Sequence, residues 1–99
     1  MLKGKQRSYL KTLAQQMQPT IYIGKADLTD AIVKSIDDNL NANEMVKCQI
    51  QDGSELDPKE TCSKLAEQLN AEFVQAIGHR FVLYRRAKDP SKRKIELPR

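Results

Sequence analysis

The spacing of apolar positions divides the chain into alternating helices and strands. Three stretches repeat apolar side chains every three or four residues, as amphipathic helices do. Four others are β-branched, aromatic or alternating, as strands are. The expected helices cover residues 3–17, 29–41 and 58–70, and the expected strands cover residues 20–23, 45–51, 73–77 and 80–85. Gly78 and His79 separate the last two strands, so we expect a hairpin with glycine at the first turn position.

The resulting order predicts an α/β (α+β) fold, a single domain α-β-α-β-α-β-β with a mixed four-stranded sheet and helices packed on it. Ninety-nine residues suffice for one core, so residues 1–99 are treated as one domain. In strand 45–51, alternation places Cys48 inward and Lys47 outward. Residues 86–99 are polar and lack periodicity, which predicts a basic C-terminal tail.

Residues 20–30 are expected to form a short strand, a glycine loop and the first turn of a helix. Gly24 allows a positive φ and close approach of the backbone to another molecule. The helix start behind it directs free N–H groups and the positive end of the helix dipole outward. Such a loop favours a phosphate-bearing partner, although plain turns of this kind are common. Either Thr29 caps the helix, or Asp27 and Asp30 form a capping box.

Composition excludes several classes of protein. The chain is 39% hydrophobic and 30% charged, which is ordinary for a soluble globular protein. No apolar run is long enough to span a membrane and none follows the basic N-terminus, so we expect no membrane partner, no secretory signal and a cytoplasmic location. Cys48 and Cys62 fall at apolar positions, which indicates buried reduced thiols. Their spacing does not match a zinc site, so no metal is expected.

Catalytic chemistry is not expected either. His79 is the only histidine, it lies in a turn, and no serine or cysteine has a credible base beside it. The glycine motifs of nucleotide-hydrolysing and dinucleotide-binding sites are missing from the sequence. We therefore expect a protein that is not an enzyme, with no cofactor and no small-molecule substrate.

The net charge of +4 is unevenly distributed. Residues 1–11 contain four basic and no acidic side chains, and residues 85–99 contain seven basic and two acidic ones. The residues between them contain six basic and eleven acidic side chains. If the two ends meet in space, they form one electropositive face. Lys3, Arg7 and Lys11 also form a helical ridge with no acidic neighbour on it, which favours an anionic partner over an ordinary solvated surface.

The end of the last strand adds further candidate contacts. Arg85 and Arg86 carry forked guanidinium groups that suit phosphates, and Tyr84 either stacks on a base or packs in the core. The aromatic pair of an RRM and the recognition helix of a helix-turn-helix protein are both missing from the pattern. RNA is the partner that these features favour. The residues expected to contact it are Lys3, Lys5, Arg7, Lys11, Gly24, Lys25, Ala26, Arg80, Tyr84, Arg85 and Arg86.

Several motifs resemble the bacterial YhbY-like proteins, which are stand-alone CRM domains. These motifs are Gly-Lys-Gln-Arg at 4–7, Ile-Gly-Lys at 23–25 before Leu28-Thr29, Glu-Met-Val-Lys at 44–47, Val-Leu-Tyr-Arg at 82–85 after Gly78, and Ile-Glu-Leu-Pro at 95–98. The resemblance covers nearly the whole chain. It implies a fold similar to the C-terminal domain of translation initiation factor three. It also implies RNA binding, association with precursors of the large ribosomal subunit, and a role in ribosome assembly.

The resemblance also gives the loop after the first strand a function. In the family this loop is a GxxG, similar in idea to the KH-domain loop that clamps nucleotide backbones. Asp27 replaces the second glycine here. A carboxylate facing a phosphate weakens binding, whereas an Asp27 that turns back to cap the helix leaves Gly24 and Lys25 facing the RNA.

We therefore expect a monomeric RNA-binding protein that acts on ribosomal RNA in pre-large-subunit particles. A protein-interaction module is the first alternative, in which the basic face docks on an acidic ribosomal or assembly factor. A translation factor acting on mature subunits is the second, and it rests on analogy of fold alone.

Overall fold

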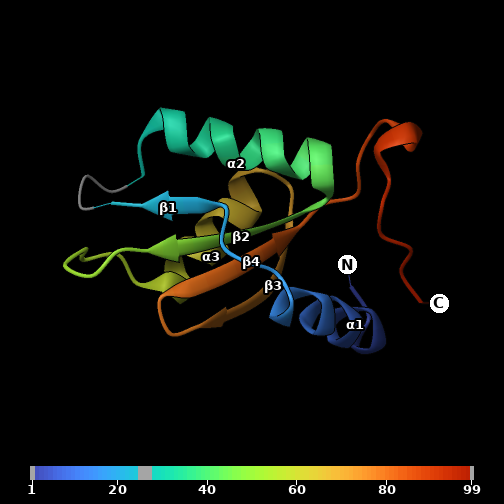
Figure 1. The fold of residues 1–99 in the computed structure, drawn as a ribbon, viewed down its shortest axis with the longest axis horizontal. Coiled ribbons are helices and arrows are strands. Elements are labelled where there is room, and N and C mark those ends of the chain that lie inside the picture. Colours follow the sequence, from blue (N-terminus) through green and yellow to red (C-terminus); the bar gives the residue numbers. More distant parts are fainter. Residues whose placement is uncertain (1, 25–27, 99) are drawn as a thin grey trace.

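The computed structural model describes residues 2–24 and 28–98, which form a four-stranded sheet with helices on both faces (Figure 1). The helices are α1 (Gly4–Gln15), α2 (Asp30–Asn43) and α3 (Pro58–Gln68), and the strands are β1 (Ile21–Ile23), β2 (Met45–Ile50), β3 (Glu72–Ile77) and β4 (Arg80–Tyr84). A short 3-10 turn, η1 (Pro90–Lys92), follows in the tail. The predicted α+β order and the mixed sheet are confirmed. No helix in the described part of the chain has the length and apolar character needed to cross a bilayer.

The strand order in the sheet is β1-β2-β4-β3. β1 runs parallel to β2, because α2 carries the chain back between them, and the other two pairs are antiparallel. Gly78 begins the turn between β3 and β4 with a φ of 60°, a positive value that glycine adopts readily. The parallel pair and the hairpin bring the end of β1 and the start of β4 to the same end of the sheet, on the left in Figure 1.

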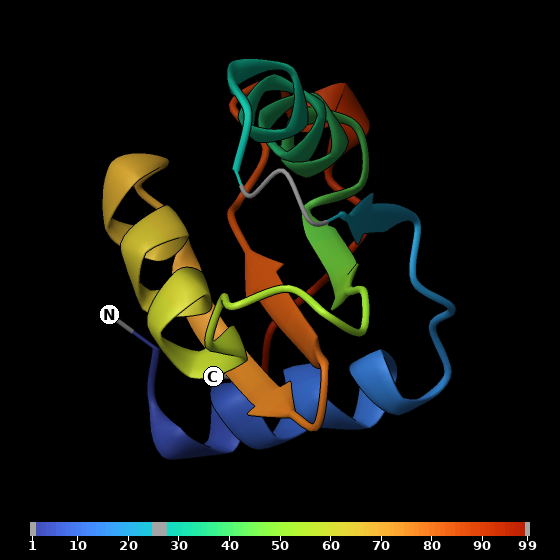
Figure 2. The ribbon, with the colours of Figure 1, turned by 90° about the vertical axis from the view of Figure 1, so that its left-hand side faces the viewer.

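Helices cover both faces of the sheet, and the protein therefore has two hydrophobic clusters (Figure 2). On one face α2 and α3 pack on the sheet, and Ile36, Leu65 and Phe81 belong to the same buried cluster. On the other face α1 packs on the sheet, and Leu10 and Val82 belong to the second buried cluster. β2 lies in the middle and is buried on both sides, which alternation along one strand does not reveal.

Lys47 was expected to face solvent, and that expectation is wrong. Its side chain lies under α1, where Nζ donates hydrogen bonds to the carbonyl oxygens of Ala14 at 2.9 Å and Met17 at 3.2 Å. Ala14 lies in the last turn of α1 and Met17 just beyond it, so the ammonium group joins β2 to the C-terminal end of the helix, where a positive charge is favoured. Burial, and after it the charge of Arg80, lowers the pKa of Lys47.

The structure distinguishes between the two N-caps that were expected for α2. Thr29 is the N-cap, and its Oγ1 accepts a hydrogen bond from the Ile32 N–H at 3.2 Å. The helix continues to Asn43, two residues beyond its expected end at residue 41, and Glu44 ends it in the left-handed conformation with a φ of 66°. Glu44 is fully buried, and its position directly after the helix turns its carboxylate toward the C-terminal tail.

Candidate nucleic-acid interface

The two basic ends of the chain meet in space. Gln6 Nε2 on α1 donates a hydrogen bond to the Pro98 carbonyl oxygen at 3.1 Å. Ile95 and Leu97 of the tail pack on the same hydrophobic cluster as Leu10 of α1. The basic start of α1 and the basic tail therefore lie together at the right-hand end of the molecule in Figure 1.

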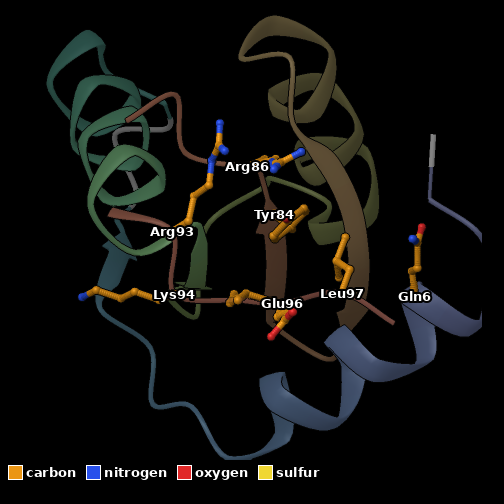
Figure 3. A pocket seen from close by; sticks show the side chains of 8 residues that line it. Gln6, Tyr84, Arg86, Arg93, Lys94, Glu96 and Leu97 are labelled. Atoms are coloured by element: carbon orange, nitrogen blue, oxygen red, sulfur yellow. The ribbon is translucent and has the colours of Figure 1, made fainter. Parts of the chain in front are cut away.

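A groove of about 750 Å³ lies between the start of α1, the end of β4 and the tail (Figure 3). The side chains that line it are Gln6, Tyr84, Arg86, Arg93, Lys94, Ile95, Glu96 and Leu97. Three of them are cationic and one is anionic, so the groove is electropositive. Polyanions are attracted to a concave surface of this kind because its charges act together.

The buried carboxylate of Glu44 fixes the tail that forms one wall of the groove. Its Oε1 accepts hydrogen bonds from the backbone N–H groups of Lys94 at 2.6 Å and Ile95 at 2.9 Å, and its Oε2 accepts one from Ala87 at 2.9 Å. Burial of Glu44 acts to raise its pKa, but the three N–H donors and the charge of Arg93 outweigh burial, and the pKa lies below its usual value. Glu44 is therefore ionised at neutral pH, and it holds the backbone from which Lys94 projects.

The predicted ridge on α1 lies at the same end of the molecule. Lys3, Lys5 and Lys11 are exposed, and α1 contains no acidic residue. Arg7 is half-buried, and its enclosed Nε has no hydrogen-bond partner among the described residues. Because Nε is enclosed, an anion approaching this surface would meet Arg7 only through the terminal nitrogens of its guanidinium group.

Tyr84 takes the core position that was one of its two expected placements. It is only 4% exposed and packs in the cluster beneath α1. Burial, followed by the charge of Glu44, raises the pKa of Tyr84, and the charges of Arg86 and Arg93 act in the opposite direction. Its ring forms the floor of the groove (Figure 3) and leaves no free face of the size that a stacked base requires.

Arg85 was expected at the RNA surface, but its guanidinium group is occupied inside the protein. Nη1 lies 2.8 Å from Asp37 Oδ1 and also donates to the Leu69 carbonyl oxygen at 2.8 Å. Nη2 donates to Asn41 Oδ1 at 2.9 Å and to the Asp37 carbonyl oxygen at 3.2 Å. These contacts join the end of β4 to α2 and to the end of α3, so Arg85 stabilises the fold. Arg86, the next residue, is exposed and lines the groove.

Gly24 and Arg80 lie at the opposite end of the sheet from the groove. Lys25, Ala26 and Asp27 fall outside the described residues. Gly24 does not have a positive φ, and a Cβ at this position would meet only Gln51 Oε1, at 3.6 Å. Backbone geometry therefore does not require glycine here. The exposed side chain of Arg80 donates from Nε to Gln49 Oε1 at 2.9 Å.

Sequence reasoning missed two cations of the groove, Arg93 and Lys94. The excess of basic residues over 85–99 included them, but a tail without periodicity offered no way to place them. Burial raises the pKa of both cysteine thiols, Cys48 and Cys62, to about 12, so neither ionises at neutral pH. Within residues 2–24 and 28–98, no group of three or more histidine, cysteine or acidic side chains is placed to hold a metal ion.

Comparison with known protein families identifies the family to which the chain belongs. The model of the CRS1 / YhbY (CRM) domain matches residues 2–85, which is most of the chain. This chain belongs to the CRM domain family. The match includes α1, the sheet and the loop after β1, and it ends where the tail begins.

Several proteins are similar to this CRM domain along nearly their whole length. The probable RNA-binding protein YqeI of Bacillus subtilis is 33% identical over 98 residues, which cover 99% of this chain and 100% of that protein. An RNA-binding protein of Haemophilus influenzae is 33% identical over 99 residues, covering 99% of this chain and 96% of that protein. A solution structure from Staphylococcus aureus, described as a candidate RNA-binding protein, is 39% identical, has a TM-score of 0.81 and covers 99% of this chain and 100% of that one.

Proposed function

We propose that this CRM domain binds RNA through the electropositive surface formed where α1 and the C-terminal tail meet. The observation that carries this proposal is the groove in which Arg86, Arg93 and Lys94 are held beside the basic ridge of α1. The names of the similar proteins from Bacillus subtilis and Haemophilus influenzae support RNA as the polyanion.

The surface suits the RNA backbone better than individual bases. Its exposed cations extend from α1 across the groove, and side chains of this kind contact phosphates without reading sequence. We assign the contacts to Lys3, Lys5, Lys11, Arg86, Arg93 and Lys94, with Arg7 as an additional donor. Arg85 and Tyr84 are left out of this assignment, because the first is occupied internally and the second is buried.

Salt dependence tests the proposal directly. Six phosphate contacts predict that log K against log salt has a slope of about −4 for single-stranded RNA. An affinity that does not change with salt would contradict the proposal. Replacing Arg86 and Arg93 together by alanine should weaken binding. It should also make the slope less steep by about 1.4, because each lost phosphate contact removes about 0.7 from it. The matched control replaces Lys59 and Lys64, two exposed lysines on α3, and should leave both quantities unchanged.

We further propose that the RNA is ribosomal and is met in precursors of the large ribosomal subunit, with this protein acting in the cytoplasm as a monomer without catalytic chemistry. The family resemblance supports this finer assignment. Sedimentation of cell extract tests it. We expect the protein to travel with precursor particles, and travel with mature subunits alone would contradict it.

A pull-down with and without ribonuclease separates RNA binding from docking on an acidic protein. If the groove binds RNA, digestion releases the partners. Partners that survive digestion and are lost on replacing Arg86 and Arg93 would instead show that the same basic surface binds protein.

A further inference from the structure

α1 leaves part of its face of the sheet uncovered, and one row of side chains crosses that open area. The backbone register pairs Tyr22 of β1 with Gln49 of β2, Gln49 with Arg80 of β4, and Arg80 with Ile77 of β3. The row therefore contains one residue from each of the four strands. None of the four takes part in either hydrophobic cluster.

The direction of these side chains follows from their neighbours. Ile21 and Ile23 on either side of Tyr22 enter the core beneath α2 and α3, as do Cys48 and Ile50 beside Gln49. Because side chains alternate along a strand, the row must face the other way. Tyr22 is 54% exposed and Ile77 is 68% exposed, two of the largest apolar exposures among the described residues.

The middle of the row is fixed and polar. Arg80 Nε donates to Gln49 Oε1 at 2.9 Å, which holds the guanidinium group and the amide side by side. The terminal nitrogens of Arg80 and the amide nitrogen of Gln49 remain as donors. Adjacent strands lie about 4.8 Å apart, so the row extends roughly 14 Å from Tyr22 to Ile77. That length accommodates two or three nucleotides of a single strand.

Charge favours a nucleic acid as the occupant. A hollow of about 260 Å³ beside Arg80 is lined by Gln15, Lys47, Gln75, Ile77, Arg80 and Val82. The described residues that line it include the exposed Arg80 and the buried, hydrogen-bonded ammonium of Lys47, and no carboxylate. Gln15 lies one helical turn beyond Lys11, so the basic ridge of α1 leads directly to this hollow.

We propose that the row formed by Tyr22, Gln49, Arg80 and Ile77 is a platform for unpaired nucleotides of single-stranded RNA. The ring of Tyr22 stacks on an unpaired base, Gln49 donates to a base edge, and Arg80 contacts the phosphate beside it. This inference rests on the proposed function, and it adds a contact to bases at the end of the sheet opposite the groove. A duplex does not use the platform, because its bases are already stacked in pairs.

Three tyrosine variants test the platform, with a short unstructured RNA and its duplex as probes. We expect Tyr22→Ala to bind the single strand about tenfold more weakly and the duplex as the wild type does. Tyr22→Phe retains the ring and should bind as the wild type does. The matched control is Tyr9→Ala, an exposed tyrosine on α1 one helical turn from Lys5, and it should leave the ratio of single-strand to duplex affinity unchanged. Thermal unfolding of each variant establishes that it is folded.

A direct signal complements the affinities. The chain contains no tryptophan, so Tyr22→Trp introduces a single indole whose fluorescence a stacked base quenches. We expect quenching by the single strand and little by the duplex. Unchanged affinity of Tyr22→Ala, equal losses for both probes or an unquenched indole would overturn the platform, while a salt-dependent wild type would leave the proposed function standing. A wild type that binds neither probe would overturn both.

Discussion

The carboxylate of Glu44 accepts a hydrogen bond from the backbone N–H of Ile95 at 2.9 Å, across 51 residues of sequence. This bond, with those to Lys94 and Ala87, joins the residue that ends α2 to the tail that completes the groove. The conformation of the tail thus depends on one buried side chain, and the groove depends on the tail.

Glu44→Gln should therefore destabilise the protein. The amide replaces one acceptor oxygen with an NH₂ group, so at least one of the three backbone N–H groups loses its partner, and the charge is lost as well. We expect a cost of about 2 kcal/mol in the free energy of unfolding, in the range for hydrogen bonds to a charged group. Urea titration measures it. Glu96→Gln is the control, because Glu96 is exposed in the same tail, and an equal cost for both variants would contradict the prediction.

The same carboxylate should make stability depend on pH. Its pKa is lower in the folded protein than in the unfolded chain, so the unfolded state binds the proton more readily. The contribution of Glu44 is complete above the unfolded pKa of about 4.3 and is lost as the pH falls through the folded pKa. Urea midpoints measured from neutral to acidic pH should fall less steeply for Glu44→Gln than for the wild type. Parallel curves would show that Glu44 does not contribute to the acid sensitivity.

Substitutions of the adjacent residues Arg85 and Arg86 should affect different properties, the first the stability of the fold and the second the affinity for RNA. Arg85→Ala removes four internal contacts and leaves the Leu69 and Asp37 groups without their partner, so we expect a loss of about 2 kcal/mol in unfolding free energy. Arg86→Ala should change stability little and weaken RNA binding, because its side chain is exposed in the groove. Urea titration and RNA affinity, measured on both variants, check this. The reverse result would return Arg85 to the RNA surface.

The start of α2 offers a test of capping next to the loop after β1. Thr29→Ala removes the acceptor for the Ile32 N–H and should cost about 1 kcal/mol of stability. Ser35→Ala, in the middle of the same helix, should not destabilise the protein, because alanine has the higher helix propensity. Thermal unfolding of the two variants decides, and a cost confined to Ser35→Ala would contradict the cap assignment.

The sequence predicted the elements well because their patterns are local. Apolar spacing located α1 to within three residues at its ends, and a positive φ at Gly78 fits the predicted hairpin. The buried position of Lys47 depends instead on a helix that precedes its strand and covers the face assumed to be open. The pattern along one strand contains no information about such a cover.

The sequence predicted the charge of the candidate site better than the positions of its side chains. The excess of basic residues at both ends correctly indicated a shared electropositive end, since Gln6 and Pro98 are in contact. Tyr84 and Arg85 illustrate the limit. Their side-chain types suit RNA equally well in the core or on the surface, and only the packing of α1 and the acceptors on α2 and α3 distinguish the two placements. The likeness to translation initiation factor three stays a prediction.

The two cysteines have a practical consequence. Cys48 of β2 and Cys62 of α3 are buried in the same cluster, and both thiols remain protonated at neutral pH. Thiol reagents attack the thiolate, so they react with these residues only when α3 separates from the sheet. A fluorophore can consequently be attached at a cysteine introduced on the surface without first removing the native pair. The slow labelling of that native pair then records how often the core opens.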